Sequence, residues 1–454
     1  MKPFEHQKVA ILRIEECDGS CLLADDMGLG KTITALGCLR RNPDWTPAVI
    51  VCPSAVKINW QREANKMGMT TAICNGRTPP SEKGVIDGAA KILIINYDVL
   101  PHWRTYLESL KLKMMILDES QYLANKQSKR TQAARKLSRK IGRTLAMSGT
   151  PIVNRPVELY STVNIIWPKE FNNFQIYANR FCAPKMGFQG MDYSGASNLP
   201  ELHAKLTRLG MIRRRKGVIV GLPDLKRQIL RAPLSDPQQY EEARDNFAIW
   251  IRKKHPKKAN SSLKAAGMAQ VGYLLRLAAR LKIDAVCKKM HGWLKENPDE
   301  KLVVMCIHRD IGESLVKNIS VKSIQIHGGV TGKDRQLAVD VFQRDPETRL
   351  AVCNIKAAGI GVDGLQKAAR RLSFVELWWN PSTHFQCEGR LERIGQEREI
   401  LIDYIVGKGT IEERLCRILQ SRQKVASAAI DGDKEVATFN IYEELLNEMK
   451  KESK

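Results

Sequence analysis

Short, uniformly apolar runs alternate with longer amphipathic stretches along the first third of the chain. Three of these runs are Ala48–Cys52, Ile92–Ile95 and Met114–Leu117, which read AVIVC, ILII and MMIL. Runs this short and this apolar are typical of strands that are buried on both faces of a parallel sheet. Because helical patterns separate the runs, we expect an α/β lobe over residues 1–165.

The same alternation returns in the second half of the chain. Further buried strands are predicted at Leu302–Ile307, Ser323–Ile326, Leu350–Val352 and Leu372–Val375. They predict a second α/β lobe over residues 286–410, so the expected fold class is α/β with two tandem parallel-sheet lobes.

The segment between the lobes, residues 166–285, has a different pattern. It carries the basic clusters Arg213–Lys216 and Arg252–Lys258 and a helical pattern over Gly272–Met290. We therefore expect a helical, basic middle region between the lobes. Residues 411–454 are expected to form C-terminal helices with a charged end.

The charge balance points to a polyanionic partner. Lys and Arg number 73 and Asp and Glu 49, which gives a net charge of +24. Nucleic acid is the simplest such partner, although a protein with many solvated surface lysines gives the same balance, so charge alone leaves both interpretations open.

The cysteines and the apolar runs exclude several classes of protein. None of the eleven cysteines forms a CxxC pair, and the closest two are Cys17 and Cys21, so we expect reduced thiols and no zinc site. No run of about 18 uncharged apolar residues is present, and the N-terminal MKPFEHQKVAIL has no apolar segment before its first charges. Neither a membrane span nor a secretory signal is expected.

Residues 22–36 read LLADDMGLGKTITAL, a short apolar run that leads into a glycine-rich turn and then a helical pattern. That context predicts a phosphate-binding loop, although Asp25 stands where the general pattern has a glycine. In such a loop Lys31 reaches the β and γ phosphates of a nucleotide, and the Thr32 hydroxyl binds Mg²⁺.

Asp118 and Glu119 follow the apolar run Met114–Leu117. Carboxylates at the carboxyl end of a parallel strand lie in the ligand crevice, where Asp118 can hold Mg²⁺ and Glu119 can orient and deprotonate water. A solvated acid pair at a strand end is the alternative. The phosphate loop upstream favours the catalytic interpretation.

Six ordered motifs resemble those of superfamily 2 helicase-like ATPases, and more closely the Swi/Snf-type DNA-dependent translocases. They are DDMGLGKT, Asp118-Glu119-Ser120-Gln121, Ser148-Gly149-Thr150-Pro151, Lys356–Asp363, Trp379-Asn380-Pro381 and Gln386–Gln396. MDYSGASNLPEL followed by MIRRRKGVIVGLP resembles the annealing-helicase-like branch, in a minimal phage or bacterial form. The resemblance covers about residues 1–420 and implies two RecA-like lobes, ATP and Mg²⁺ as cofactors, and DNA as partner.

The resemblance also implies roles at individual positions. Gln7 would recognise adenine, Ser148 and Thr150 would couple the nucleotide to DNA, and Arg390 and Arg393 would act as arginine fingers. Two arginines three apart share one face of a helix, which suits that last role. The residues expected to contact ATP are Gln7, Asp26, Met27, Gly28, Leu29, Gly30, Lys31, Thr32, Asp118, Gly361 and Asp363.

A track for DNA is predicted on both lobes. From Asn125 to Val157 there is no acidic residue, while nine Lys or Arg residues occur, which favours phosphate contact over a merely solvated face. By resemblance, the DNA-contacting positions are Pro53, Ser54, Asn96, Tyr97, Ser148, Thr150, Arg309 and His327. Trp60 fits either a DNA-facing or a core position, and Arg213–Arg215 fit either the duplex or a join between lobes.

The expected function is an ATP-dependent translocase on double-stranded or branched DNA, independent of base sequence, that remodels DNA, anneals strands or displaces proteins. A strand-separating helicase is the first alternative, disfavoured because the sequence shows no extra wedge domain. An ATP-switched nucleic-acid-binding protein without turnover is the second, disfavoured by Lys31, Glu119, Arg390 and Arg393. We expect a cytoplasmic, nucleoid-associated monomer, or one in the host cytoplasm if the chain is phage-encoded.

Overall fold

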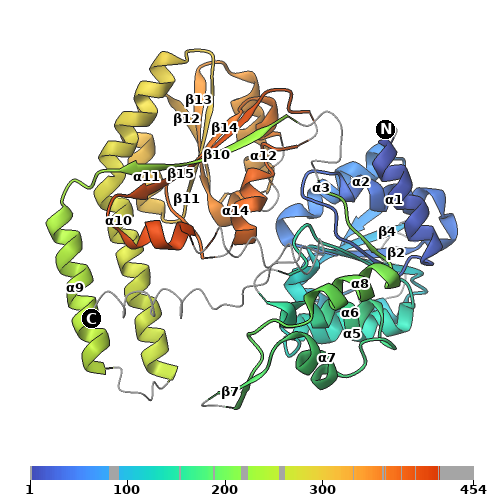
Figure 1. Cartoon of the computed structure of the whole chain (residues 1–454). Helices are drawn as coiled ribbons and strands as arrows, with labels where there is room; N and C mark the ends of the chain where they lie inside the picture. Colours follow the sequence, from blue (N-terminus) through green and yellow to red (C-terminus); the bar gives the residue numbers. More distant parts are fainter. Residues whose placement is uncertain are drawn as a thin grey trace. The chain divides into compact units, whose positions relative to one another are not determined.

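The computed structural model of the chain divides into two compact units, Met1–Val220 and Gly221–Arg422 (Figure 1). The structure describes residues 3–80, 91–152, 155–187, 190–215, 223–254, 261–330, 332–359, 362, 364–379, 381–393, 395–417 and 419. Each unit is a parallel sheet covered by helices on both faces, which confirms the predicted α/β class.

The first unit contains a seven-stranded sheet in the order β3-β4-β2-β5-β6-β1-β9. In that order, the strands are Thr71–Ile73, Ile92–Asn96, Ala48–Cys52, Met114–Asp118, Thr144–Met147, Cys21–Leu23 and Met211–Ile212. The three strands predicted from apolar runs are β2, β4 and β5, and every residue of β2 and β4 is buried. All pairings are parallel, so the carboxyl ends of the strands share one edge.

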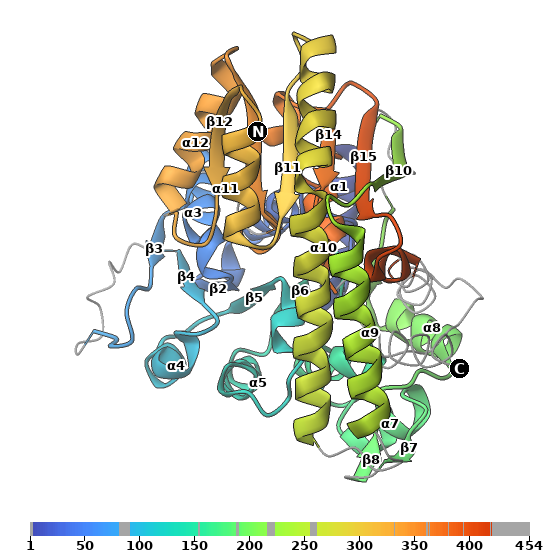
Figure 2. The same cartoon turned by 90° about the vertical axis from the view of Figure 1, so that its left-hand side faces the viewer.

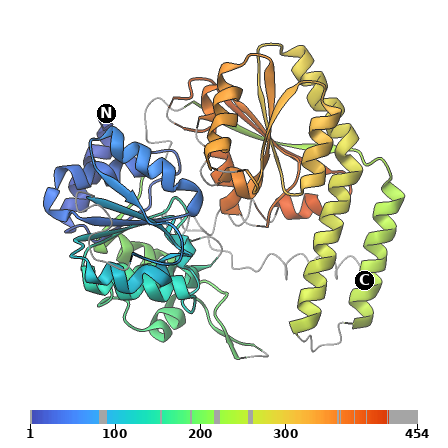
Figure 3. The ribbon, with the colours of Figure 1, turned by 180° about the vertical axis from the view of Figure 1, so that it is seen from behind.

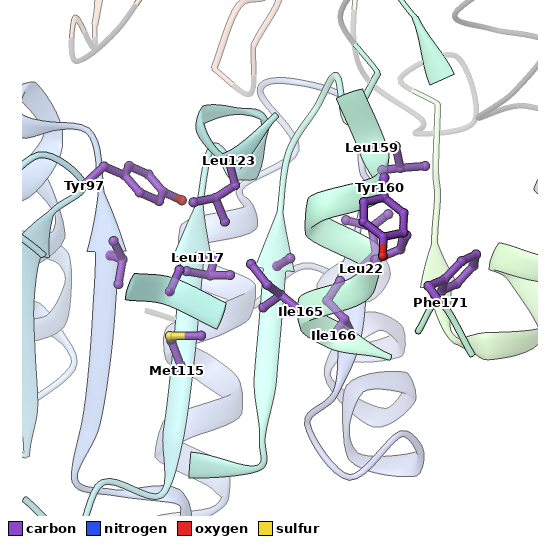
Figure 4. Close-up of a cluster of buried hydrophobic side chains, with 14 of the residues drawn as sticks. Leu22, Tyr97, Met115, Leu117, Leu123, Leu159, Tyr160, Ile165, Ile166 and Phe171 are labelled. Carbon is purple, nitrogen blue, oxygen red and sulfur yellow. The ribbon is translucent and has the colours of Figure 1, made fainter. Parts of the chain in front are cut away.

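Side chains of alternate strand residues build a separate core on each face of this sheet. Ala48, Ile50 and Cys52 pack with helices α1–α3, whereas Val49 and Val51 pack with α4–α8. The helices are Glu5–Glu16, Lys31–Arg41, Lys57–Lys66, Leu100–Ser109, Lys129–Ile141, Tyr160–Ile166, Phe174–Phe181 and Leu199–Leu209. Figure 4 shows part of the second core, where Tyr97 and Leu123 lie above Leu117 and Met115.

The second unit contains a six-stranded parallel sheet in the order β10-β15-β14-β11-β13-β12. In that order, the strands are Leu225–Ala232, Ile400–Gly407, Arg371–Phe374, Leu302–Cys306, Thr348–Asn354 and Lys322–Ile326. The four strands predicted from apolar runs are therefore confirmed as β11–β14.

Helices α9–α14 accompany this sheet, and α9 runs beside α10 (Figure 2). They are Pro237–Lys254, Ser261–Glu296, Arg309–Asn318, Gly332–Arg344, Ile355–Gly359 and Pro381–Glu388, labelled α9–α14. The helix predicted at Gly272–Met290 lies inside α10. Residues 411–417 are helical, and the rest of the predicted C-terminal helical stretch lies outside the described residues, apart from residue 419.

The middle region is less helical than its sequence pattern suggested. Besides helices α7–α9 and part of α10, it contributes strand β9 to the first sheet and strand β10 to the second. It also forms an antiparallel hairpin of β7 (Lys185–Gly187) and β8 (Gly190–Asp192). The chain thus divides after Val220, within this region.

Two general properties bear on the partners of the protein. Within the described ranges, no helix has the length and the apolar character needed to cross a bilayer. A search of the same ranges finds no group of three or more His, Cys, Asp or Glu side chains that could hold a metal ion.

Candidate active site

The predicted phosphate loop connects β1 to α2 at the carboxyl edge of the first sheet. Gly28 and Gly30 have φ angles of 89° and 76°, a left-handed conformation that favours glycine at both positions. The Lys31 amine folds back over the loop and donates to the backbone oxygens of Asp25 at 2.8 Å and Asp26 at 3.2 Å. The backbone oxygens of the loop therefore bind the Lys31 amine, and a nucleotide phosphate would compete with them for it.

Strand register brings the other predicted motifs to this loop. Met147 at the end of β6 pairs with Leu23 on one side and Asp118 on the other, so Ser148–Thr150 lie between the loop and Glu119. A Cβ on Gly149 would lie 2.6 Å from Met27 Cγ and 3.3 Å from Lys31 Nζ. Gly149 is thus the residue that permits this close approach.

Gln7 fixes helix α1 to the phosphate loop. Its side chain is 2% exposed; its Nε2 donates to the Leu29 oxygen at 3.2 Å, and its Oε1 accepts from Phe4 N at 2.9 Å. His6 Nε2 also lies 3.0 Å from the Leu29 oxygen. The structure therefore places Gln7 beside the loop, and its contact with adenine stays a prediction.

Two arginines that follow β9 brace the acidic part of the loop. Arg214 makes a bidentate ion pair with Asp25, a carboxylate that is fully buried, and it also donates to the His6 oxygen. Arg213 Nη1 lies 2.7 Å from both the Ala24 oxygen and Asp26 Oδ1. This pairing explains how an aspartate is accommodated where the general loop pattern has a glycine, and it places both arginines at the loop.

Asp118 ends β5 in a half-buried position, close to the charges of Glu119 and Lys31. Trp60 Nε1 donates to Asp118 Oδ2 at 2.8 Å, and the Tyr97 hydroxyl donates to the Asp118 backbone oxygen at 2.8 Å. Burial and the neighbouring Glu119 charge raise the pKa of Asp118 to about 7, against the opposing effects of Trp60 and Lys31. Burial also lowers the pKa of Lys31, and the charges of Glu119, Asp25, Asp118 and Asp26 oppose that shift.

Glu119 stands at the head of a short hydrogen-bond chain. Its φ of 52° is in the left-handed region, a strained conformation for a residue with a side chain. Gln121 Nε2 donates to Glu119 Oε2 at 2.7 Å, and the Ser148 hydroxyl donates to Gln121 Oε1 at 2.6 Å. Thr150 N in turn donates to Ser148 Oγ at 3.0 Å. Gln121 thereby connects the candidate base to the Ser148–Thr150 segment.

The oxygen donors at this edge fit a magnesium ion. Mg²⁺ prefers carboxylate and hydroxyl oxygens and retains several waters. Asp118 offers a carboxylate at the end of β5, and Thr32 offers a hydroxyl at the first turn of α2. These two residues would hold the ion together with the phosphates of a nucleotide.

The predicted arginine fingers of the second unit do not share a helical face. Helix α14 ends at Glu388, and backbone bonds of turns follow, including Gly389 N to the Phe385 oxygen at 2.8 Å. Glycine ends helices readily, which accounts for the break before Arg390. Arg390 Nη1 donates to the Val362 oxygen at 2.9 Å, and Arg393 lies in the following turn.

Burial distinguishes the residues predicted to contact DNA. Tyr97 is 1% exposed and stacks on Tyr122 at 5.4 Å, and Asn96 is 7% exposed, so both lie behind the surface in this structure. Trp60 is 1% exposed and belongs to the core. Pro53 is buried, whereas Ser54 is exposed at the carboxyl edge of the sheet.

In the second unit, Arg309 and His327 follow the carboxyl ends of β11 and β12. Arg309 pairs with Glu313 at 2.7 Å on an exposed helical turn, and His327 accepts from Gly329 N at 3.2 Å. Gly361 and Asp363, predicted to contact ATP, lie outside the described residues.

The nine cations of the acid-free segment 125–157 serve two purposes. Five of them have interactions within the protein or a buried guanidinium, and these are Lys126, Arg130, Arg135, Arg143 and Arg155. Lys129, Lys136, Arg139 and Lys140 on α5 are exposed and pair with no described acid. These four are the cations available to phosphates.

Sequence reasoning missed several residues that build the site. Gln121 was interpreted only as part of a motif, although an amide two residues after Glu119 can bridge a carboxylate and a hydroxyl. Asp25 and Asp26 pair with arginines that lie nearly 190 residues away along the chain. The cluster of arginines after β9 indicated that acidic partners were needed. The sequence could not identify those partners, because only the pairing of β9 with β1 brings the two segments together.

Comparison with protein families gives two matches. A family described as SNF2-related domain matches residues 4–284, and one described as helicase conserved C-terminal domain matches residues 281–395. Together they cover residues 4–395, which include nearly all of the first unit and most of the second.

Comparison with individual proteins gives relatives that match nearly the whole of this chain. The human DNA annealing helicase and endonuclease ZRANB3 is 30% identical over 450 residues, covering 94% of this chain and 40% of that protein. The Xenopus laevis SWI/SNF-related matrix-associated actin-dependent regulator of chromatin subfamily A-like protein 1 is 32% identical over 443 residues, covering 94% and 44%. The chain thus spans less than half the length of these relatives.

Among solved structures, the Sulfolobus solfataricus SWI2/SNF2 ATPase core in complex with dsDNA is 22% identical, covering 95% of this chain and 94% of that one. The TM-score between the two is 0.44.

Proposed function

The chain belongs to the SNF2-related family, and on that premise we propose that it is a DNA-dependent ATPase that translocates along double-stranded DNA and remodels branched DNA. The relatives are named for DNA annealing and for chromatin regulation. Both names suit a motor that moves on a duplex, and this is the activity we carry to the present chain.

The observation that carries the proposal is the contact chain from Glu119 through Gln121 to Ser148. A carboxylate held by a neutral amide keeps its charge and its orientation, which a general base for water requires. Ser148 holds the same amide, and the family resemblance implies that Ser148 couples the nucleotide to DNA. A change at Ser148 would therefore move Glu119 through one side chain.

The remaining residues of the first unit would bind and orient the nucleotide. Lys31 would leave the Asp25 and Asp26 oxygens for the phosphates, and the loop N–H groups at the start of α2 would cradle them. Asp118 and Thr32 would hold Mg²⁺, which when bound neutralises phosphate charge. Arg390 and Arg393 would supply positive charge to the γ-phosphate in the transition state.

The DNA partner we propose is duplex or branched and is contacted without regard to base sequence. The exposed cations Lys129, Lys136, Arg139 and Lys140 support phosphate binding, which carries affinity and little sequence information. We further propose that the protein works as a monomer. We also propose that it acts in a reducing, DNA-containing cytoplasm, because all eleven cysteines are free thiols and ten are buried.

One ATPase assay tests the proposal, run without nucleic acid and then with single strands, duplex, forked DNA and RNA. Turnover is expected to be low alone and to rise with duplex and forked DNA. Because neutralised phosphates release counterions, stimulation should be measured at low salt first and then titrated. Activity with RNA alone, or no stimulation by any DNA at low salt, would overturn the DNA assignment.

A second assay separates translocation from strand separation. The motor is expected to displace a triplex-forming third strand and to leave a plain tailed duplex intact. Robust unwinding of the tailed duplex without triplex displacement would favour the strand-separating helicase. ATP binding that changes DNA affinity without turnover would favour the ATP-switched binding protein.

A further inference from the structure

The β7–β8 hairpin carries a pair of exposed methionines. Met186 and Met191 are directly opposite each other in the hairpin register and are 82% and 42% exposed. Directly opposed residues share one face of a two-stranded sheet, so their thioether side chains form one apolar surface. The hairpin forms its own two-stranded sheet, and Figures 1 and 3 show it extending beyond the helices of its unit.

The base of this hairpin is held in place by the protein. Ala183 and Asn198 flank it with φ angles of 39° and 49°, strained conformations that persist only where the surroundings impose them. Ser197 Oγ accepts from Ala183 N at 3.1 Å and donates to the Arg180 oxygen at 2.8 Å. Asn198 Nδ2 donates to the same oxygen at 2.8 Å. A fixed base under an exposed apolar face is suited to presenting that face to a partner.

The hairpin connects directly to the basic surface of the first unit. Tyr193, just after β8, packs edge-on against Phe174 with ring centroids 5.4 Å apart, and Lys126 Nζ lies 3.1 Å from the centroid of the same Phe174 ring. Lys126 begins the acid-free run of cations that includes the exposed ones of α5. Positive charge thus continues from the proposed phosphate-binding surface to the foot of the hairpin.

We propose that the β7–β8 hairpin is a wedge that recognises the branch point of DNA, with Met186 and Met191 packed against bases exposed where the strands part. Proteins that bend or open DNA insert apolar side chains, methionine among them, between base steps. A flexible, polarizable thioether adapts to any base, which suits recognition without sequence preference. The inference rests on the proposed function, since it names the DNA structure which that motor would prefer.

Nucleic acid is the occupant we favour over a protein surface. The segment that includes Lys126 carries four exposed cations that pair with no described acid, namely Lys129, Lys136, Arg139 and Lys140, and Lys185 at the start of β7 is also exposed. The nearest acid of the hairpin, Asp192, accepts from Ser194 N and the Ser194 hydroxyl, both at 2.9 Å. This surface therefore fits a polyanion whose apolar groups are exposed only where it opens, as the bases of a DNA branch are.

The test compares wild type with the double variants Met186→Ser/Met191→Ser and Met186→Leu/Met191→Leu, with Leu337→Ser as an exposed apolar control in the second unit. Affinity for a fork and for a plain duplex of equal length is measured, together with ATPase stimulation by each. The serine variant is expected to lose about tenfold in fork affinity, the scale of one base stack, and to keep duplex binding and duplex-stimulated turnover. The leucine variant and Leu337→Ser should match wild type.

A base analogue whose fluorescence rises on unstacking, placed at the fork junction, gives a second measurement. Wild type and the leucine variant should raise its emission, and the serine variant should not. Equal fork affinity in wild type and the serine variant would overturn the wedge, and this is the result expected if the hairpin binds a protein instead. Equal losses of affinity for fork and duplex would also overturn it. If no DNA stimulates ATP hydrolysis by the wild type, the proposed function itself fails. The measurement of ATPase stimulation by plain duplex detects that failure independently of the hairpin variants.

Discussion

At the scale of single residues, the site is held by side chains that stand behind those that would touch the nucleotide. Trp60 and Tyr97 fix Asp118 from the core, and Gln121 fixes Glu119 from the neighbouring turn. The Trp60 and Gln121 bonds, 2.8 and 2.7 Å long, orient the two carboxylates, and the Tyr97 bond holds the Asp118 backbone. Orientation of this kind is what a positioned base requires.

Glu119→Gln tests the base directly. The amide keeps the shape of the side chain and removes its proton affinity, while Lys31 and Asp118 remain for phosphate and metal. Nucleotide affinity should therefore stay within a few fold, and DNA-stimulated turnover should fall by about 10²-fold or more. Binding is checked with a fluorescent nucleotide and turnover with phosphate release. Turnover like that of wild type would remove Glu119 from its role.

Asp118→Asn tests the electrostatic cost of the metal site. Because the folded pKa of about 7 lies above the ordinary value of 3.8, ionisation of Asp118 removes stability as pH rises between these values, and the cost is complete above pH 7. In metal-free protein with chelator, the variant should gain roughly 1–3 kcal/mol at pH 8 and clearly less at pH 5. The measurement is Tm at both pH values.

The control for that measurement is Asp98→Asn, whose carboxylate is 76% exposed. It should leave the difference between the two pH values close to that of wild type. An equal Tm gain for Asp118→Asn at pH 5 and pH 8 would contradict the burial of a titrating charge at this site.

At the residue scale, the sequence predicted where the motif residues meet better than it predicted the side chains that support them. Lys31, Asp118, Glu119 and Ser148 meet at one edge as expected, because motif spacing and strand ends carry that information. Tyr97 was expected at the DNA and lies in the core instead. Its aromatic character fits either place, and only the packing of Tyr122 and Leu123 over it decides.

At the scale of secondary-structure elements, a strand from the middle region completes the phosphate loop. The two residues of β9 pair with β1, and the next two residues are the arginines that hold Asp25 and Asp26. The loop is therefore braced by a segment far along the chain. Its conformation depends on the middle region being folded onto the first sheet.

Arg214→Met tests this brace. The substitution leaves the Asp25 carboxylate buried without its cation, which costs about 3–5 kcal/mol in comparable sites. We expect a lower Tm of the first unit and weaker nucleotide binding. The double variant Asp25→Asn/Arg214→Met should recover most of both, because no charge is then buried. If the double variant is as damaged as the single one, the arginine acts by packing alone.

The exposed cations of α5 make a prediction about salt. Replacing Lys136, Arg139 and Lys140 by Gln should lower the slope of log DNA affinity against log salt by about 0.9 for each phosphate that is no longer neutralised. Arg143→Gln is the matched control, since Arg143 pairs with Asp18 at 2.9 Å and lies over the Trp45 ring. Affinity is measured by fluorescence anisotropy across a salt series. An unchanged slope in the triple variant would exclude α5 from the DNA surface.

Elements were predictable from sequence where burial on both faces dominates their composition. Strands β2, β4 and β11 are uniformly buried, so apolar runs marked them. Strand β10 reads LKRQILRA and is largely exposed at a sheet edge, so no apolar run announced it. The helix expected to carry Arg390 and Arg393 stops at Glu388, before a glycine whose effect the spacing argument did not weigh.

At the scale of the whole molecule, the proposed chemistry is divided between two units that each complete their own sheet. The phosphate loop, Asp118 and Glu119 belong to the first unit, and Arg390 and Arg393 belong to the second. Each unit places its motifs at the carboxyl edge of a parallel sheet, where ligands of such folds bind. On the proposed function, hydrolysis would need residues of both units, whereas nucleotide binding would need only those of the first unit.

Arg393→Ala tests that division of labour. An arginine that acts on the γ-phosphate in the transition state contributes about 10³-fold or more to turnover in related phosphoryl transfer and little to ground-state binding. DNA-stimulated turnover should therefore collapse while nucleotide affinity, set by the first unit, changes only a few fold. The control is Arg398→Ala, whose guanidinium is 46% exposed and pairs with Glu300 at 3.1 Å. Equal losses of binding and turnover for Arg393→Ala would make it a ground-state ligand or a structural residue, and the second unit would then contribute DNA contacts without completing the site.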